Sequence, residues 1–258
     1  MGTHEQGFIS MSDFDRGLAR PGTVAAPDMA VDTGLRAFML GVYNKVALGL
    51  VLSAALAYVT GNVPAVQALL FRVDGANHIG YTVLGMIVAF APLAILIFQR
   101  FARQQTAQGA AITYWAIVSL IGASLGMVFI IYSGVSIFQT FLVTAAAFGG
   151  LSLIGYTTKR DLSGMGSFLI MGVWGLVFAM IATLFFHSPM LVFIINLLGV
   201  GIFAGLIAAQ TQGLKLMYYQ VGGDQVAASV ATSYGALSLY LDFINLFRFL
   251  LYFMGGRR

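Results

Sequence analysis

The feature that most limits what this chain can fold into is a series of unbroken apolar runs, each about 20 residues long. A helix of that length crosses the hydrocarbon core of a bilayer, whereas a barrel strand needs about ten residues and alternates apolar with polar side chains. These runs do not alternate. They predict seven membrane-spanning helices, over residues 38–60, 81–98, 112–131, 137–156, 168–186, 190–209 and 230–253.

The composition fits an integral membrane protein, since 59% of the residues are hydrophobic and only 9% are charged. Residues 1–33 differ from the rest, because they are polar and contain Pro21 and Pro27, so we expect a flexible N-terminal tail. This tail has acidic residues where a signal peptide would be basic. The sequence therefore predicts a tail over 1–33 and one all-α domain over 34–258, a seven-helix transmembrane bundle.

Basic residues outside the predicted spans are divided unevenly between the two sides of the membrane. The side of the N-terminus holds eight of them: Arg16, Arg20, Arg36, Arg100, Arg103, Lys159, Arg160 and Lys215. The other side holds Arg72, Arg257 and Arg258. The positive-inside rule therefore predicts a cytoplasmic N-terminus. Because Arg257 and Arg258 then lie outside, an alternative stays open in which the last run breaks near Asp242 and re-enters the cytoplasm as a hairpin.

The last run contains a carboxylate, Asp242, at a depth of about 16 to 18 Å from either end of residues 230–253. Four residues fall along one stripe of this helix at spacings of i, i+3, i+7 and i+10: Gly235, Ser238, Asp242 and Asn245. An ionised carboxylate in hydrocarbon is costly, so we expect the stripe to face protein or water. Such a residue indicates an ion or proton path, or a hydrogen-bonded pair that locks the bundle through Gln210, Ser238 or Asn245.

Other chemistry has little support in the sequence. The chain has no cysteine and three scattered histidines, so we expect no metal site, no cofactor and no enzymatic activity. The string Gly122-Ala-Ser-Leu-Gly126 matches a serine-hydrolase elbow, but it lies inside an apolar run and is also a Gly-xxx-Gly pair. We interpret it, like Gly201 with Gly205, as a close helix contact. The net charge of +4 is explained by loop topology, so no nucleic-acid partner is expected.

Three segments resemble the Bax inhibitor-1 family, also called the transmembrane Bax inhibitor motif family, in its bacterial branch. They are residues 35–44, 155–163 and 238–247. The resemblance implies seven helices with the last one at the centre. It also implies a calcium leak across the membrane, or the restraint of cell-death and membrane-protease machinery.

The sequence departs from this family at one position. The resemblance implies a second aspartate near the end of the sixth span, in a Tyr-Asp-Thr-Gln context, whereas here Gln210 stands at that place in Ala209-Gln210-Thr211-Gln212. Two carboxylates in contact titrate as a coupled unit, which an amide and a carboxylate cannot do. We therefore expect any pH response to depend on Asp242 alone.

Together these observations favour a passive cation leak, selective for calcium or open to other cations, in the bacterial inner membrane. Asp242, Gln210, Asn245 and Ser238 are its predicted pathway or gating residues. Arg100, Arg103, Lys159 and Arg160 are expected to form basic cytoplasmic loops that fix topology, with a gating contact as the alternative. The alternative function is a non-conducting regulator that binds and restrains a membrane protease or a stress or cell-death complex.

Overall fold

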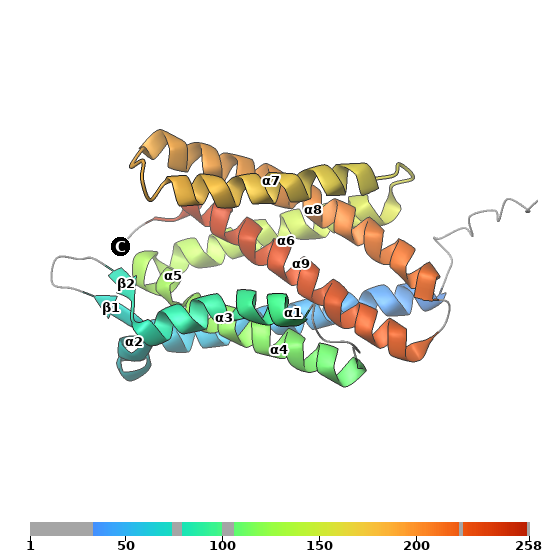
Figure 1. Cartoon of the computed structure of the whole chain (residues 1–258), viewed down its shortest axis with the longest axis horizontal. Coiled ribbons are helices and arrows are strands. Elements are labelled where there is room, and N and C mark those ends of the chain that lie inside the picture. The colour runs from blue at the N-terminus through green and yellow to red at the C-terminus, as the bar shows by residue number, and fades with distance from the viewer. Residues whose placement is uncertain (1–32, 74–78, 100–105, 222–223, 257–258) are drawn as a thin grey trace, which may run out of the picture. The chain divides into compact units, whose positions relative to one another are not determined.

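The computed structural model describes residues 33–73, 79–99, 106–221 and 224–256. The predicted tail lies outside these residues apart from Thr33. Gly34–Arg258 forms one compact unit, whose described residues contain nine helices and two strands (Figure 1). They are α1 (Thr33–Asn62), α2 (Pro64–Leu70), β1 (Phe71–Val73), β2 (Ile79–Tyr81), α3 (Val83–Gln99), α4 (Ala107–Ser124), α5 (Gly126–Ile131), α6 (Gly134–Thr157), α7 (Ser163–Ala182), α8 (Pro189–Val221) and α9 (Gln225–Met254).

The described fold is helical, as expected, with one exception. β1 and β2 pair antiparallel in a two-stranded sheet, with Arg72 opposite Gly80. Six helical segments are long and apolar enough to cross a membrane: α1, α4 together with α5, α6, α7, α8 and α9. The remaining predicted span, over residues 81–98, corresponds to α3, which is apolar but has only 17 residues.

Several helix ends follow from local capping. The side chains of Thr106 and Ser133 accept hydrogen bonds from backbone N–H groups at the starts of α4 and α6, and Asp224 does the same for α9. Leu125 interrupts the predicted run over 112–131 and separates α4 from α5. α8 continues beyond the predicted boundary at Ala209 to Val221, because polar residues in its last turns are buried against neighbouring helices.

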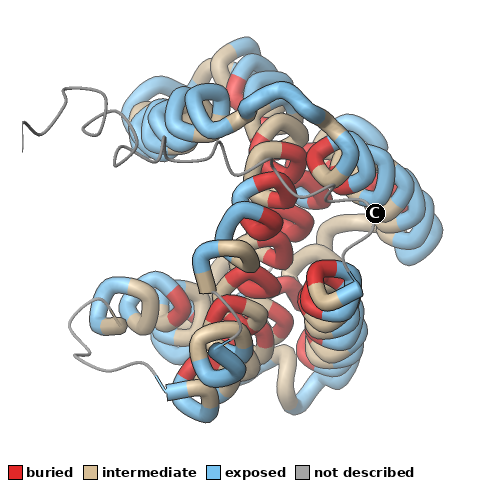
Figure 2. Tube along the Cα trace, turned by 90° about the vertical axis from the view of Figure 1, so that its right-hand side faces the viewer, coloured by how far each residue is buried: buried red, intermediate tan, exposed pale blue. Residues whose placement is uncertain are grey.

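Helix α9 is the most buried of the candidate spans. In its most apolar 18-residue window 56% of the residues are buried, against 28% or less in the other five. Figure 2 shows buried residues running through the middle of the bundle, with exposed residues on the outer helices. α9 is also one continuous helix of 30 residues, so the alternative of a hairpin broken near Asp242 is wrong.

Glycines allow two of these helices to approach closely. A Cβ atom on Gly122 would lie 2.6 Å from the Cα of Ser53 on α1, and one on Gly126 would lie 2.9 Å from the Cβ of Thr60. The predicted close contact at this Gly-xxx-Gly pair is therefore confirmed. The same prediction for Gly201 is wrong, because no atom lies within 4 Å of the place its Cβ would take. Gly205 does lie close to a neighbour, the side chain of Leu169.

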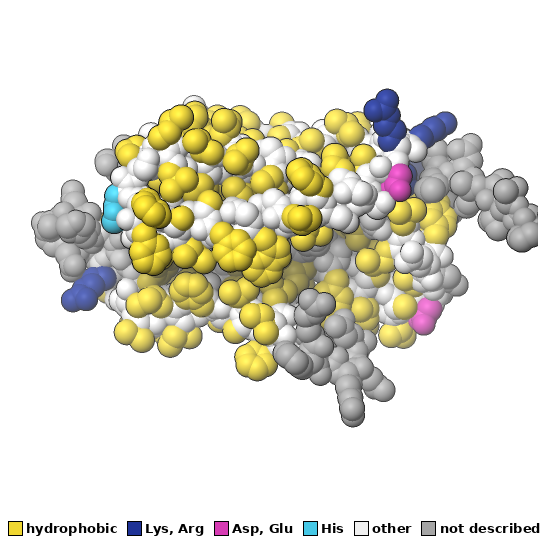
Figure 3. Space-filling model, turned by 45° about the horizontal axis from the view of Figure 1, so that its top comes forward, with side chains coloured by type: hydrophobic (Ala, Val, Ile, Leu, Met, Phe, Trp, Pro, Cys, Tyr) yellow, Lys and Arg dark blue, Asp and Glu magenta, His cyan; other side chains and the backbone are white. Residues whose placement is uncertain are grey.

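The unit has two polar ends separated by apolar flanks. Figure 3 shows hydrophobic side chains over the flanks, while the visible Lys, Arg, Asp and Glu side chains lie toward the ends. We call one end the Lys159 end; α1 and α9 begin there, and the loop 158–162 lies there. The Arg72 end is the opposite one, with the β1–β2 sheet and the end of α9 (Figure 1).

Candidate functional site

The polar stripe predicted on α9 faces the protein interior. Gly235 and Asp242 are buried, and Asp242 is only 4% exposed. Ser238 and Asn245 are half-buried. The position of Gly235 against the Leu214 side chain explains why the stripe begins with a glycine, since a Cβ there would collide with that leucine. The stripe therefore faces protein at Gly235 and Asp242, its two buried residues.

Helix α8 runs antiparallel to α9 and meets it at the predicted glutamine. The hydroxyl of Ser238 donates a hydrogen bond to Oε1 of Gln210. Further along, Phe249 on α9 stacks on Phe203 with ring centroids 5.7 Å apart. The structure thus brings Gln210 and Ser238 together across the α8–α9 seam.

Asp242 lies one helical turn from Ser238 but does not join this pair. Its Oδ2 atom is buried and has no hydrogen-bond partner among the described residues, and none of Gln210, Ser238 and Asn245 donates to it. The next residue, Phe243, packs against Phe141 and Phe148 of α6, with centroids 5.6 and 5.5 Å away. A buried polar atom without a partner is costly, and a proton or a cation bound there would offset that cost.

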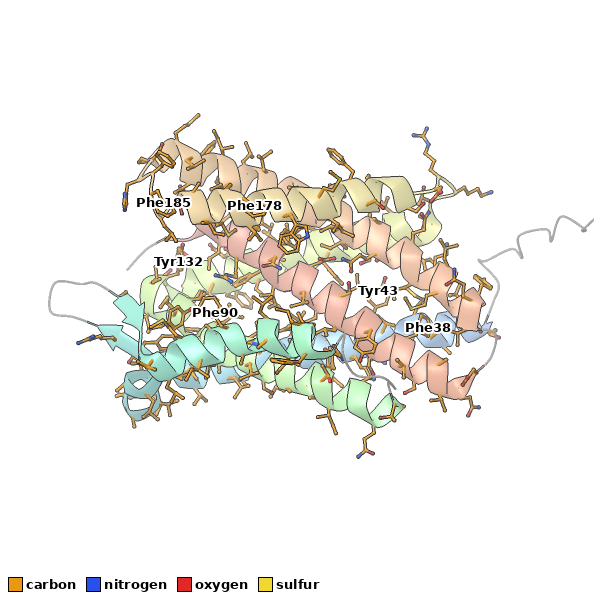
Figure 4. The ribbon with its side chains drawn as sticks, viewed as in Figure 1. Phe38, Tyr43, Phe90, Tyr132, Phe178 and Phe185 are labelled. Atoms are coloured by element: carbon orange, nitrogen blue, oxygen red, sulfur yellow. The ribbon has the colours of Figure 1, made fainter. Side chains whose placement is uncertain are left out.

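A cavity of ≈ 380 Å³ opens at the Arg72 end, and Asn245 is part of its wall. Asn245 follows Asp242 by three residues, a rise of about 4.5 Å along nearly the same helix face. The cavity therefore ends about one turn from the buried carboxylate. Its wall also includes Tyr132, which Figure 4 places toward the end of the bundle that carries the sheet, opposite Phe38.

The side of Asp242 toward the Lys159 end is closed by contacts between helices. The Ser238–Gln210 hydrogen bond lies one turn away, and the contact of Gly235 with Leu214 follows. Helix α1 adds a hydrogen bond of 2.6 Å between the hydroxyls of Ser53 and Tyr240. Among the described residues, the cavity thus approaches Asp242 from the Arg72 end, and these helix contacts lie on the opposite side.

At the Lys159 end, α8 holds the loop between α6 and α7 through its buried polar residues. Nε2 of Gln212 donates to the Arg160 carbonyl and its Oε1 accepts from the Leu162 N–H, both at 2.7 Å. Lys215, only 7% exposed, donates to the Tyr156 carbonyl and lies 4.9 Å from the centre of the Tyr156 ring. The loop is therefore fixed to α8 by its backbone.

The charged side chains of this loop do not take part in these buried contacts. Lys159 and Arg160 are exposed. The hydroxyl and the backbone N–H of Ser163 donate to Oδ1 of Asp161 at 2.6 and 2.9 Å, which holds the pKa of that exposed carboxyl below its usual value. Arg100 and Arg103, the other predicted basic residues, lie outside the described part of the chain.

Sequence reasoning missed a polar seam between α1, α4 and α9. Nζ of Lys45 donates to the Ser233 hydroxyl at 2.7 Å, and the Tyr114 hydroxyl donates to the Lys45 carbonyl at 2.6 Å. It also missed that Asn196 and Arg248 share the cavity wall with Asn245. A signal was present, because Lys45 and Arg248 are the cations inside predicted spans. Ser233, which Lys45 contacts, and Asn196, which shares the cavity wall with Arg248, lie far from them in the sequence.

Comparison with known proteins gives a consistent result. Residues 35–258 match the family described as "Inhibitor of apoptosis-promoting Bax1". An uncharacterized protein of Caulobacter vibrioides is 60% identical over 249 residues, which cover 96% of this chain and 100% of that protein. The inner membrane protein YbhL of Escherichia coli K12 is 41% identical over 229 residues, covering 87% of this chain and 94% of YbhL. An uncharacterized protein of Rickettsia prowazekii is 42% identical over 92% of this chain and 96% of its own length.

Proposed function

Because this chain belongs to the Bax inhibitor-1 family, we propose that it forms a passive cation leak, with calcium as a permeant ion, and that Asp242 in α9 is the charged element of the pathway. The observation that carries this proposal is the carboxylate itself. Asp242 is buried within a candidate span, and its Oδ2 has no hydrogen-bond partner among the described residues. Ionisable residues in such positions typically belong to ion or proton pathways.

The cavity at the Arg72 end supplies half of the proposed route. It reaches Asn245, one turn from Asp242. A tight calcium site needs six to eight oxygen ligands, several of them anionic. Asp242 and Asn245 offer only a few oxygens, so an ion completing its shell with water would bind weakly and leave readily. Weak binding suits a leak.

The other half of the proposed route requires movement. Toward the Lys159 end, the contacts between α8 and α9 at Ser238 and Gly235 close the seam. In this proposal, the described conformation is closed, and conduction requires α8 to separate from α9 near Gln210. Since Gln210 cannot share a proton with Asp242 as a second carboxylate would, any pH dependence of this opening reflects Asp242.

The proposal includes a topology. α3, with 17 residues, extends about 25 Å, which is just enough to span, and counting it gives seven spans. An odd number places the termini on opposite sides. Following the positive-inside rule, we place the end with the exposed Lys159 and Arg160 in the cytoplasm. Because α1 begins at that end, the proposed N-terminus is cytoplasmic. The relative YbhL is named as an inner membrane protein, and we assign this chain to the same membrane.

Flux through the pure protein tests the function. The full chain is reconstituted into liposomes that contain a calcium indicator, and calcium entry is compared with that in protein-free vesicles of the same lipid. Entry that rises in proportion to the amount of protein supports the leak. Entry no faster than in protein-free vesicles overturns it and leaves the alternative, a non-conducting regulator that acts by binding a membrane protease or a stress complex.

A further inference from the structure

Arg248 is a charged residue of α9 that lines the cavity of the proposed cation pathway, although that pathway gives it no role. It follows Asp242 by six residues and precedes the end of the helix at Met254 by six, so it lies about 9 Å along the axis from each. This depth is within the outer part of the span. A guanidinium cannot be deprotonated in a protein, so its charge at this depth needs a compensating group.

The structure gives Arg248 no such group among the described residues. It is exposed, and no described residue forms a hydrogen bond or an ion pair with it. It lines the ≈ 380 Å³ cavity at the Arg72 end, and none of the described residues in that wall is acidic. The described part of the wall therefore carries a net positive charge, which opposes the entry of cations until an anion neutralises it.

The rest of the cavity wall fits an amphiphilic anion. Neutral hydrogen-bonding groups come from Asn196 and Asn245 and from tyrosines on β2, on α9 and next to α5. Nδ2 of Asn196 donates one of its two hydrogens to the Val192 carbonyl at 2.7 Å, so its second N–H can donate to an anion. Apolar residues such as Met180 and Leu251 form the remaining surface. A volume near 380 Å³ is within the usual range of small-ligand pockets.

We infer that this cavity binds a phosphate group, with Arg248 as the charged anchor and the two asparagines as neutral hydrogen-bonding partners. Arginine pairs with phosphate in a bidentate manner, which a fork of N–H donors on an exposed side chain allows. The phosphate can come from the headgroup of an anionic phospholipid or from free phosphate in the aqueous phase. The inference concerns binding and does not depend on whether the chain conducts cations.

Ligand-dependent thermal stability of the purified full chain tests this inference. The probes are short-chain phosphatidylglycerol, short-chain phosphatidylcholine and inorganic phosphate, each titrated against delipidated protein in detergent. Four proteins are compared: the wild type, Arg248→Gln, Arg248→Lys and Arg72→Gln. The last removes the same charge at the same end of the molecule, but outside the cavity wall.

The expected result is a saturating rise in melting temperature of the wild type with phosphatidylglycerol. Arg248→Gln should weaken the apparent affinity about tenfold, since a charge-assisted pair is lost. Arg248→Lys should lie between the two, because it keeps the charge but not the bidentate geometry, and Arg72→Gln should match the wild type. A similar response to inorganic phosphate identifies the free ion as a sufficient ligand, and a response to phosphatidylglycerol alone identifies the lipid.

Two results would overturn the inference. One is equal stabilisation of wild type and Arg248→Gln by both anionic probes. The other is equal stabilisation by phosphatidylcholine and phosphatidylglycerol, because the contact would then be to the acyl chains. If Arg248→Gln does not fold, the comparison of Arg248→Lys with the wild type decides the matter in the same way.

Discussion

The contact between α4 and α1 at Gly122 yields a sharp test of the helix packing. Substitution of Gly122 by Ala places a Cβ 2.6 Å from the Cα of Ser53 and 3.1 Å from its carbonyl oxygen. Both are backbone atoms, so no side chain can rotate away. Because nonpolar carbon atoms prefer separations of about 3.5 to 4.0 Å, the two helices must move apart by roughly 1 Å at this point.

The displacement affects hydrogen bonds as well as packing. Ser53 donates to the Val118 carbonyl at 3.1 Å and shares a 2.6 Å hydrogen bond with Tyr240 on α9. Overpacking of a fitted contact typically costs about 1–3 kcal/mol. At about 2–4 °C per kcal/mol for a protein of this size, the apparent melting temperature should fall by about 2–12 °C.

The assay is thermal unfolding of the purified variants in one detergent, with Gly201→Ala as the matched control. From sequence, Gly122 and Gly201 predict the same close contact, but the structure leaves open space at Gly201. The control should therefore keep the wild-type melting temperature or gain slightly from the better helix propensity of alanine. Equal losses in the two variants, or no loss in Gly122→Ala, would refute the packing described here.

Three further predictions concern the pathway and the topology. Gln210→Asp places a carboxylate beside Ser238, which lies one turn from Asp242. Coupled titration of the two carboxylates should make cation flux depend more steeply on pH, over about pH 5 to 8, than in the wild type. An unchanged pH profile would show that residues 210 and 242 do not interact. Because the chain has no cysteine, the variants Asn245→Cys and Ser238→Cys each carry a single thiol. A membrane-impermeant maleimide added from the Arg72 end should modify Asn245→Cys much faster than Ser238→Cys. Equal rates of modification would exclude a one-sided cavity. Reporter fusions after Arg103 and after Arg160 should both indicate the cytoplasm, and a periplasmic signal from either would reverse the topology.

The helical spans could be predicted from sequence because the bilayer imposes a length and a composition on each one. The limits of this reasoning appear where polar residues are buried by protein. α8 passes the predicted end at Ala209 because Gln212 and Lys215 find partners in the loop after α6 and in the last turn of α6. These partners precede them by 50 and 59 residues in the sequence. A hydropathy window treats such residues as the end of a helix. The β1–β2 sheet was missed because its strands have three residues each.

The candidate site was predictable in part for a similar reason. Helical periodicity places Ser238, Asp242 and Asn245 on one face, and family resemblance points to Gln210. Periodicity cannot say which pairs form, and the structure joins Ser238 to Gln210 while Asp242 stays without a described partner. The cavity wall combines Asn196 of α8 with Arg248 of α9, and no local pattern connects residues from two helices.

Calcium flux through the Asp242→Asn variant tests the central claim most directly. The substitution keeps the shape of the side chain and removes its charge. The matched control is Asp224→Asn, which makes the same change on the same helix at an exposed N-cap position, where asparagine also caps well. The account predicts that Asp242→Asn lowers calcium flux into liposomes about tenfold, which corresponds to a loss of roughly 1.4 kcal/mol of attraction between the carboxylate and the cation. The melting temperature of Asp242→Asn and the flux through Asp224→Asn should both stay at wild-type values. Flux through Asp242→Asn equal to that of the wild type would show that the carboxylate has only a structural role, and the leak mechanism would be wrong.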